Sequence, residues 1–534
     1  MGRNRAATIS VLTLCTTLAL AGCSNDSGNG GASSGGGDFA EGGTLTIAID
    51  SDPGSLDPQR NVDGVNLTMG VFAYDNPVKL LDSGDVAPSV VESWTGSGTS
   101  YTLTVRKGVT CADGSAMDAK TVADNINYVG DPDAGSGMTG VAVPSGAKAT
   151  ADAAAGTVTV TLKEGAPFFL QNLAELPLVC AAGIGNRDAM KATTVGSGPF
   201  VLSKAQPGNS YEYTLRKDYA WGPDGAKTDA KGMPAKVVFK LVKSATTTAN
   251  LLLSKGVNIS YLSGPDTQRL AARKMFSDGG SIIKLELTFN QAAGLPTADV
   301  AVRRALVSAL DMKELAKVST GGLGEQANGL LTDPKICAGD TVTPNLPAFD
   351  PAAAASALDA AGWTAAGGGV RSKGGKPLTV SLIYDNEDTT NAATAEYIDA
   401  KWKALGVDVK LNGQTFDEKS DVVFGGKGPW TATLIGLGVS NPATLIPFFS
   451  GPTPADGGVN YGTMHNKVYD ESIAAAQGKA GTAGCDDWNR AESALIKDAD
   501  IVPISVSPYL YWGTGAKFDV VARILEPTSL RVLR

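Results

Sequence analysis

Few side chains in this 534-residue chain could perform catalysis. The one histidine is His465, in the run Met464-His465-Asn466, so any serine or cysteine triad would have to use it. A lone histidine in a loop is more often a plain surface residue than a general base. We therefore predict no catalytic residue and no enzymatic activity.

Phosphate-binding and metal-binding patterns are also missing from the sequence. The glycine-rich runs at 196–198, 321–324 and 374–376 match neither G-x4-G-K-[ST] nor G-x-G-x-x-G. The acidic run DNED at 385–388 lacks the spacing and closing glutamate of a calcium loop, which favours a solvated turn. We expect no cofactor and no metal. Paired carboxylates for glycoside hydrolysis stay open, because 54 acidic residues offer many pairs.

The N-terminus predicts export. Arg3 and Arg5 give a positive start, residues 8–19 are apolar and uncharged, and Leu20-Ala21-Gly22 leads into Cys23. This run resembles a bacterial lipobox, in which the cysteine sulfur receives a diacylglycerol and the chain is cut before it. We expect a signal peptide at 1–22, with cleavage nearby by an ordinary signal peptidase as the alternative. Cys23 is then the lipidation site and attaches the chain to a membrane.

Residues 23–43 are mostly Gly, Ser, Asn and Asp after the cysteine and predict a flexible tether. A tether of this length reaches about 25 Å. The rest of the chain is too long for one hydrophobic core and fits two or three domains. Its net charge is negative, −9 for the whole sequence, which argues against nucleic acid as a partner.

Cysteines suggest disulfides in an exported chain. After Cys15 and Cys23, an even number remains, and four cysteines allow three pairings. We predict Cys111–Cys180 and Cys337–Cys485, because the first two lie in one predicted subdomain and the last two bracket another. Buried free thiols are the alternative, and no Cys-x2-Cys spacing supports zinc.

Alternating patterns predict strands at 44–49, 101–106, 157–162, 211–216, 236–242 and 283–289. Apolar residues at three- and four-residue spacing predict one helix over 299–318, with Asp299 as a possible cap, and another over 350–361. A strand at 378–384, a helix at 392–405 and a strand at 407–411 form a βαβ unit with parallel strands. The pattern is that of a mixed α/β protein with at least two lobes.

Many short segments, in order, resemble the dipeptide- and oligopeptide-type extracellular solute-binding proteins of ABC importers. They span nearly all of the chain after Cys23: GGTLT at 42–46, LDP at 56–58, YDNPV at 74–78, APSVVESW at 87–94, YTLTVRKGV at 101–109, DG at 113–114 with DA at 118–119, GSGPF at 196–200, FN at 289–290, VRRAL at 302–306 with ALD at 309–311, AAGW at 360–363, and NY at 460–461 with Asn466. Any one of these segments alone would be weak.

Two positions depart from the family pattern. Cys111-Ala112 stands where many members have His or Phe before DG, which fits a Cys111–Cys180 disulfide. Peptide-binding members carry an aspartate that pairs with the amino terminus of the ligand. Here the corresponding run, GLGVSNP at 436–442, has no acid, which weakens the expectation of a free peptide as ligand.

The resemblance implies a two-lobed fold of the periplasmic-binding-protein type with mixed sheets and a hinge. Lobe one would span 44–268 plus 490–534, with an extra subdomain at about 83–194, and lobe two would span 269–489. A ligand would lie between the lobes, held by aromatic faces and polar anchors. Candidates for contact with the ligand, of which we expect three or more to line the cleft, are Tyr74, Asn290, Trp430, Tyr461, Tyr509, Tyr511 and Trp512.

The resemblance further implies a receptor without chemistry of its own. It would capture a peptide or similar small solute outside the cytoplasm, as a lipid-anchored monomer on the outer face of the cell membrane, and deliver it to an ABC permease with its ATPase subunits. An oligosaccharide or a metal chelate is the alternative ligand, and a secreted hydrolase or a sensory or adhesive lipoprotein is the alternative function.

Overall fold

The computed structural model describes residues 39–365, 367 and 369–534. The predicted signal, Cys23 and most of the predicted tether lie outside the described residues. Among the residues that are described, no helix is both long enough and apolar enough to cross a membrane.

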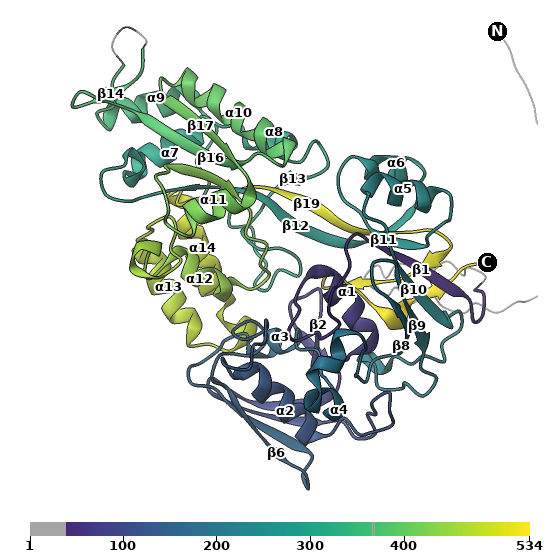
Figure 1. Ribbon diagram of the computed structural model, residues 1–534. Helices are drawn as coiled ribbons and strands as arrows, with labels where there is room; N and C mark the ends of the chain where they lie inside the picture. The colour runs from purple at the N-terminus through teal and green to yellow at the C-terminus, as the bar shows by residue number, and fades with distance from the viewer. Residues whose placement is uncertain (1–38, 366, 368) are drawn as a thin grey trace, which may run out of the picture. The chain divides into compact units, whose positions relative to one another are not determined.

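The largest sheet joins segments from the beginning, middle and end of the chain (Figure 1). Along the sheet the order is β17 (Asp408–Gln414), β16 (Thr379–Asp385), β18 (Ala432–Ile435), β12 (Phe276–Phe289), β19 (Ile501–Gly513), β11 (Ile259–Tyr261), β1 (Thr44–Ile49), β10 (Lys236–Leu241), β9 (Ser210–Leu215) and β8 (Phe200–Gln206), with β13 (Glu325–Gln326) beside β19. The strands predicted from alternation all form, with ends that shift by one or two residues except at β12, which begins earlier.

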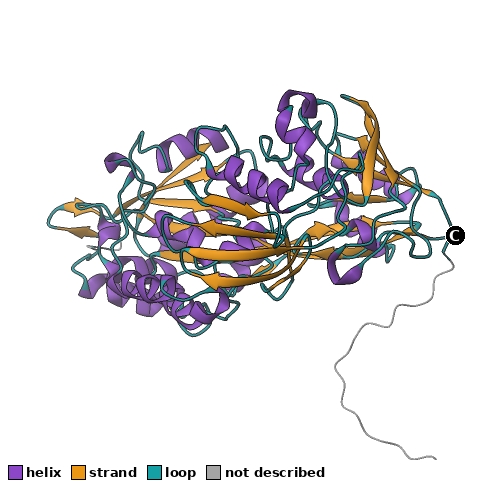
Figure 2. Ribbon diagram, turned by 90° about the horizontal axis from the view of Figure 1, so that it is seen from below, coloured by secondary structure: helices purple, strands orange, loops and turns teal. Residues whose placement is uncertain are grey.

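Two long antiparallel strands connect the two halves of this sheet. β12 and β19 pair from Phe276 opposite Gly513 to Thr288 opposite Ile501, with a register shift near Leu285. β16, β17 and β18 lie on one side of this pair, while β1 and β8 to β11 lie on the other. The fold is therefore the two-lobed mixed α/β architecture, and Figure 2 shows helices packed against its strands.

A smaller antiparallel sheet carries its own hydrophobic core. Its order is β4 (Val91–Ser97), β5 (Ser100–Val105), β7 (Thr157–Thr161) and β6 (Lys148–Asp152). Helix α2 (Ala119–Gly130) covers it, capped by Asp118, whose side chain accepts a hydrogen bond from the Thr121 N–H. Val122, Ile126 and Val129 of α2 are fully buried against the sheet.

The helix predicted over 299–318 is wrong as a single element. The chain forms α7 (Val300–Ser308), capped by Asp299 as predicted, and α8 (Met312–Ser319). The break falls before Asp311, whose carboxylate accepts hydrogen bonds from the N–H groups of Lys313 and Glu314 and so starts a new helix. Apolar spacing cannot show this break, because both helices bury their faces in the same core.

The predicted βαβ unit is confirmed. β16 and β17 pair in parallel, joined by α10 (Thr389–Ala404), and Gly406 follows with a left-handed φ of 82°. The predicted helix at 350–361 is α9 (Pro351–Ala360), where the Asp350 carboxylate accepts from the N–H groups of Ala352 and Ala353.

Both disulfides have the pairing expected from the sequence. Cys111–Cys180 closes a loop of sequence separation 69 next to the small sheet, and both cysteines belong to its core. Cys337–Cys485 spans 148 positions and joins a loop to the start of α14 (Cys485–Lys497).

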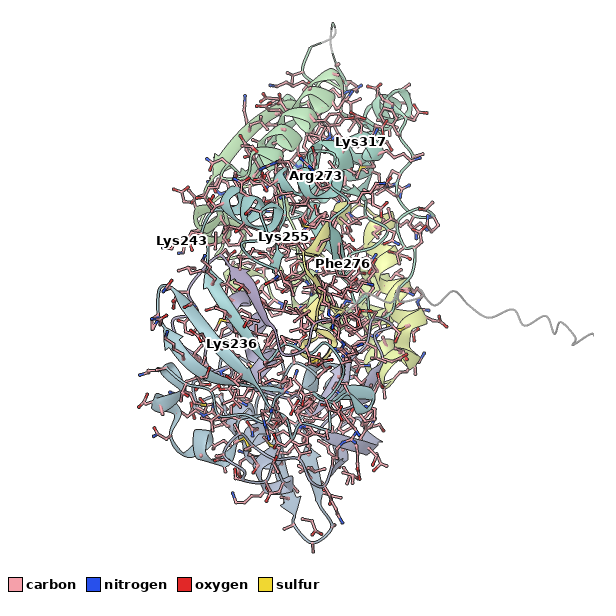
Figure 3. All side chains as sticks on the ribbon, turned by 90° about the vertical axis from the view of Figure 1, so that its right-hand side faces the viewer. Lys236, Lys243, Lys255, Arg273, Phe276 and Lys317 are labelled. Atoms are coloured by element: carbon pink, nitrogen blue, oxygen red, sulfur yellow. A yellow bond between two sulfur atoms is a disulfide. The ribbon has the colours of Figure 1, made fainter. Side chains whose placement is uncertain are left out.

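Helices α5 (Ala245–Leu253) and α6 (Asp266–Ala272) form a face with several cations (Figure 3). Lys243, Lys255 and Arg273 lie on exposed surface there. Phe276, which starts β12 and is labelled in Figure 3, packs its ring edge-on against Phe518, with 4.9 Å between the ring centroids.

Candidate functional site

A cavity of about 510 Å³ lies beside helix α1 (Gly64–Ala73), a size that suits a small-molecule ligand. We call it the main cavity. Its walls come from α1, from α3 (Phe169–Leu173) and the loop after it, from β19, from the hairpin of β21 (Val520–Val521) and β22 (Ile524–Leu525), and from residues 438–441. Ile336 and residues 438–441 belong to the 269–489 range expected for lobe two, so both predicted lobes contribute to the lining.

Tyrosines form one wall of the main cavity. Tyr509 and Tyr511 are alternate residues of β19 and face the same side. The Tyr509 ring stacks on Tyr261 at 4.3 Å and meets Tyr511 edge-on at 6.1 Å. The Tyr511 and Thr68 hydroxyls lie 3.5 Å apart. A second cavity of about 440 Å³ lies behind Thr68, Tyr509 and Tyr511.

Tyr74 lines the cavity where α1 ends. Its hydroxyl oxygen accepts a 3.2 Å hydrogen bond from the Val195 N–H, and burial raises the pKa of its phenol. The GSGPF run packs directly against this turn. A Cβ on Gly196 would lie 2.2 Å from the Ala73 carbonyl oxygen, so only glycine fits there. This contact fixes the GSGPF run against the turn that carries Tyr74.

Asp75 is buried directly behind the cavity wall. Its carboxylate accepts hydrogen bonds from the Tyr219 hydroxyl at 2.8 Å, the Ser197 hydroxyl at 2.8 Å and the Trp221 indole N–H at 2.9 Å. Burial nevertheless raises the pKa of the carboxyl, while these donors oppose the shift. The network therefore positions the backbone that carries Tyr74 and Asn76, rather than contacting a ligand.

The other four predicted contact residues are not among the described residues that line this cavity. Trp430 and Tyr461 stack within a hydrophobic core, and the Tyr461 hydroxyl lies 3.1 Å from that of Thr288. Asn290 donates to the Trp430 carbonyl oxygen at 3.2 Å and accepts from the Ala292 N–H. Trp512 points away from Tyr511, because side chains alternate along a strand, and packs under α5 and α6.

Among the described residues, the charged side chains that line the main cavity are Glu175, after α3, and Arg523, in the turn between β21 and β22. Arg523 donates a long hydrogen bond of 3.5 Å to the Ser440 hydroxyl, and its guanidinium carbon lies 5.8 Å from the centre of the Tyr509 ring. Burial lowers the pKa of this guanidinium, and the Tyr509, Glu175 and Asp333 side chains oppose the shift. Arginine remains charged under such shifts.

Sequence reasoning does not single out Glu175 or Arg523, since neither belongs to a motif or a regular pattern. Ser440 and Asn441 also line the cavity, and they belong to the run at 436–442 that lacks the expected acid. His465 is exposed and is not among the lining residues. Within the described ranges, no group of three or more His, Cys, Asp or Glu side chains is arranged to hold a metal ion.

The sequence is similar to known solute-binding proteins. Residues 85–457 match the family described as bacterial extracellular solute-binding proteins, family 5. The nickel-binding periplasmic protein of Escherichia coli is 29% identical over 364 residues, covering 64% of this chain and 66% of that protein. The periplasmic murein peptide-binding protein MppA of the same organism is 27% identical over 513 residues, covering 87% of this chain and 88% of that protein.

Solved structures share the fold over almost the whole chain. The substrate-binding protein CtaP of Listeria monocytogenes superposes with a TM-score of 0.76 at 20% identity, covering 93% of this chain and all of that one, 100%. NikA of Brucella suis, solved with Fe(III)-EDTA, superposes with a TM-score of 0.74 at 23% identity, covering 92% of this chain and 99% of that one.

The two-lobed fold and a cavity lined from both ends of the chain are those of a solute-binding protein. The family match covers more than half of the sequence. The chain belongs to the family 5 bacterial extracellular solute-binding proteins.

Proposed function

We propose that this protein is the substrate-binding lipoprotein of an ABC importer and acts as a monomer. It captures a small solute in the main cavity and delivers it to the permease, while the ATPase subunits supply the energy. The observation that carries this proposal is the lining of the main cavity, which combines Tyr74, Tyr509 and Tyr511 with residues 438–441 of the opposite lobe range. The relatives named above are substrate-binding proteins rather than enzymes, which supports a receptor without turnover.

The two lobes we propose are 44–268 with 490–534, and 269–489. β12 belongs to the second range and β19 to the first, and their long antiparallel pairing is the connection about which the lobes close. Binding energy from a ligand that contacts both lobes then favours the closed form, which is the form that docks on the permease.

A peptide-like solute is the ligand we favour, supported by the similarity to the murein peptide-binding protein. A metal chelate is the second candidate, supported by the similarity to the nickel-binding protein. The run at 436–442 contains no acid that could bind a ligand amino group, so a peptide would need another anion in the cavity.

Anchoring through a diacylglycerol on Cys23 would keep the receptor beside its permease, because two acyl chains hold a protein stably on a bilayer. The lipobox-like run supports this. Replacing Cys23 by Ala should move the protein from the detergent phase to the aqueous phase in a Triton X-114 partition. An unchanged partition would exclude the anchor.

A thermal-shift screen over amino acids, peptides, oligosaccharides and metal chelates tests the central proposal. A ligand that binds the folded protein raises its melting temperature in proportion to the logarithm of its concentration over Kd. We expect at least one solute to do so without being consumed. Turnover of a hit would favour a hydrolase, and no shift with any solute would contradict the proposed function.

A further inference from the structure

Arg523 occupies an unusual position in the backbone. β21 and β22 pair Val520 with Leu525 and Val521 with Ile524, so Ala522 and Arg523 form a two-residue turn. Both turn residues have left-handed φ values, 51° and 64°, which glycine and asparagine favour and which strain other residues. Such strain persists where surrounding contacts hold the turn in place.

Two carboxylates hold this hairpin. The Ala522 N–H donates to Asp82 at 2.8 Å, and the Val520 N–H donates to Asp278 at 2.7 Å. The Arg523 stem also packs beside Gly280, where a Cβ would lie 3.6 Å from the Arg523 Cγ. The turn therefore presents the guanidinium from a fixed backbone into the main cavity.

The Arg523 guanidinium is poorly satisfied by the protein. Its buried Nε has no acceptor, and among the described residues no carboxylate oxygen lies within 4.0 Å of its nitrogens. Asp333, which is close enough to influence it, accepts hydrogen bonds from the Ser281 N–H and hydroxyl, both at 2.7 Å. A guanidinium carries five N–H donors, and a buried charge without partners is unfavourable.

Glu175 is the negatively charged side chain that lines the main cavity together with Arg523. Its side chain is exposed, and within the described part of the chain no donor reaches its carboxylate. Desolvation by the protein around it raises the pKa of this carboxyl, and the charge of Arg523 opposes the shift. The two groups therefore attract each other without forming an ion pair.

The neighbouring charges are already paired. A smaller cavity of about 120 Å³ also opens on Glu175 and Arg523, and Asp75, Lys79 and Glu526 line it. Lys79 forms an ion pair with Glu526, and Asp75 accepts three hydrogen bonds from protein groups. Of the described charged groups that line these two cavities, Glu175 and Arg523 are thus the ones with capacity left for a ligand.

We propose that Arg523 binds the carboxylate and Glu175 binds the ammonium group of a zwitterionic solute, an amino acid or a short peptide with free ends. The inference rests on the proposed function and names the chemistry of its ligand. Tyr509, which is half-buried, provides apolar area for the rest of the solute, while Tyr74 and Tyr511 support the wall from the core behind it. Glu175 then supplies the acid that the run at 436–442 lacks.

Other ligand classes fit this pair of charges less well. A chelate with several carboxylates would bring like charge against Glu175. A neutral oligosaccharide would offer no opposite charge to either ion. A zwitterion offers an opposite charge to each and allows charge-assisted hydrogen bonds to both.

The test combines changes in the ligand with changes in the protein. The full chain is screened by thermal shift against the free amino acids and a dipeptide library, and the tightest binder is titrated by calorimetry in its free, N-acetylated and C-amidated forms. For the wild-type protein we expect each cap to weaken binding about 10- to 100-fold, because each cap removes one charge-assisted contact. Comparing amino acids with dipeptides decides which of the two is the ligand.

Two variants assign each end of the ligand. R523Q should weaken binding of the free ligand about 10- to 100-fold and leave binding of the C-amidated form unchanged. E175Q should weaken binding of the free ligand by a similar factor and leave binding of the N-acetylated form unchanged. R273Q and E92Q change the same residue types at exposed positions outside the cavity (Arg273 in Figure 3) and should bind like the wild type.

Capped ligands that bind as tightly as free ones would overturn the inference. This test uses the wild-type protein and so does not depend on the folding of any variant. If the protein bound only chelates or oligosaccharides in the thermal-shift screen that also contains those classes, the inference would be overturned while the proposed function would stand. If no solute of any class bound, both would be contradicted.

Discussion

The Asn441 side-chain amide donates a hydrogen bond of 3.0 Å to the Asn172 side-chain oxygen across one end of the main cavity. The two residues are 269 positions apart in sequence. Asn172 belongs to α3 in the range proposed for lobe one, and Asn441 belongs to the range proposed for lobe two. Asn441 also caps the short helix that follows it, because its oxygen accepts from the Ala443 N–H at 2.9 Å. This pair is a direct polar contact between the two sides of the cavity.

Replacing Asn172 by Ala should weaken ligand binding without unfolding the protein. The change removes the contact across the cavity and leaves the Asn441 cap intact. A net hydrogen bond contributes about 1 kcal/mol, which corresponds to roughly a fivefold loss of affinity if the contact belongs to the ligand-bound arrangement. Calorimetric titration of N172A measures this loss.

N328A is the matched control, because Asn328 is exposed and accepts a 2.7 Å hydrogen bond from Lys335 outside the main cavity. It should bind ligand like the wild type. Equal affinity in N172A and N328A would show that the Asn172–Asn441 contact has no part in binding.

The two disulfides should contribute strongly to stability. Replacing Cys111 and Cys180 together by Ala, or Cys337 and Cys485 together by Ala, should lower the free energy of unfolding by about 2–5 kcal/mol in each case. Chain entropy makes the longer loop the more stabilising, by less than about 1 kcal/mol between separations of 148 and 69. Denaturant melts with and without reductant measure both effects. A melting curve that reductant leaves unchanged would contradict the prediction.

The fold is well predicted from sequence where local signals agree. The β16–α10–β17 unit has alternation, a helix of ordinary length and Gly406 as its stop, and all of these form. The break between α7 and α8 is missed because Asp311 reads equally well as a surface residue of one longer helix. Its capping hydrogen bonds become visible only in three dimensions.

The cavity is less predictable, because helices, loops and strands far apart in sequence build it. Selecting aromatic residues near family motifs finds Tyr74, Tyr509 and Tyr511 at the cavity but also selects Trp430, which lies in another core. Residue type cannot show which aromatic side chains lie next to a cavity, because Tyr74 and Tyr511 are themselves core residues. Arg523 has no sequence signal at all, since its place depends on a two-residue hairpin turn held by distant carboxylates.

Gly279 should be required for the tyrosine wall. It lies opposite Leu510 in the β12–β19 pair, with a φ of 155°, and an added Cβ would lie 2.0 Å from the Tyr509 carbonyl oxygen. G279A must therefore displace β19 beside the cavity. We expect a loss of about 1–3 kcal/mol of stability together with weaker ligand binding. Thermal melts and titrations measure both.

G185A is a suitable control, because nothing lies within 4 Å of a Cβ at Gly185 in α4 (Ala181–Gly185). It should leave stability and affinity within error of the wild type. If G279A also had wild-type stability and affinity, the prediction would be wrong, because β12 and β19 would then move apart without cost.

Glu286 should make stability depend on pH. It is fully buried on β12, and burial raises the pKa of its carboxyl to about 8, while the 3.0 Å hydrogen bond from the Leu437 N–H opposes the shift and Glu492 adds to it. The folded protein therefore keeps a proton that the unfolded chain loses above its ordinary pKa of about 4.3. The contribution of Glu286 to the free energy of unfolding is therefore fully present below the pKa of the unfolded chain and is lost as the pH rises toward 8.

E286Q isolates this contribution, because glutamine does not titrate but its amide oxygen can still accept the hydrogen bond from the Leu437 N–H. Leu437 lies next to the cavity segment at 438–441. The wild type should lose stability relative to E286Q between about pH 5 and pH 8, by on the order of 1 kcal/mol for each pH unit at most. Denaturant melts of both proteins at several pH values measure the difference. Parallel stability curves would show that the carboxyl ionises in the folded protein as it does in the unfolded chain.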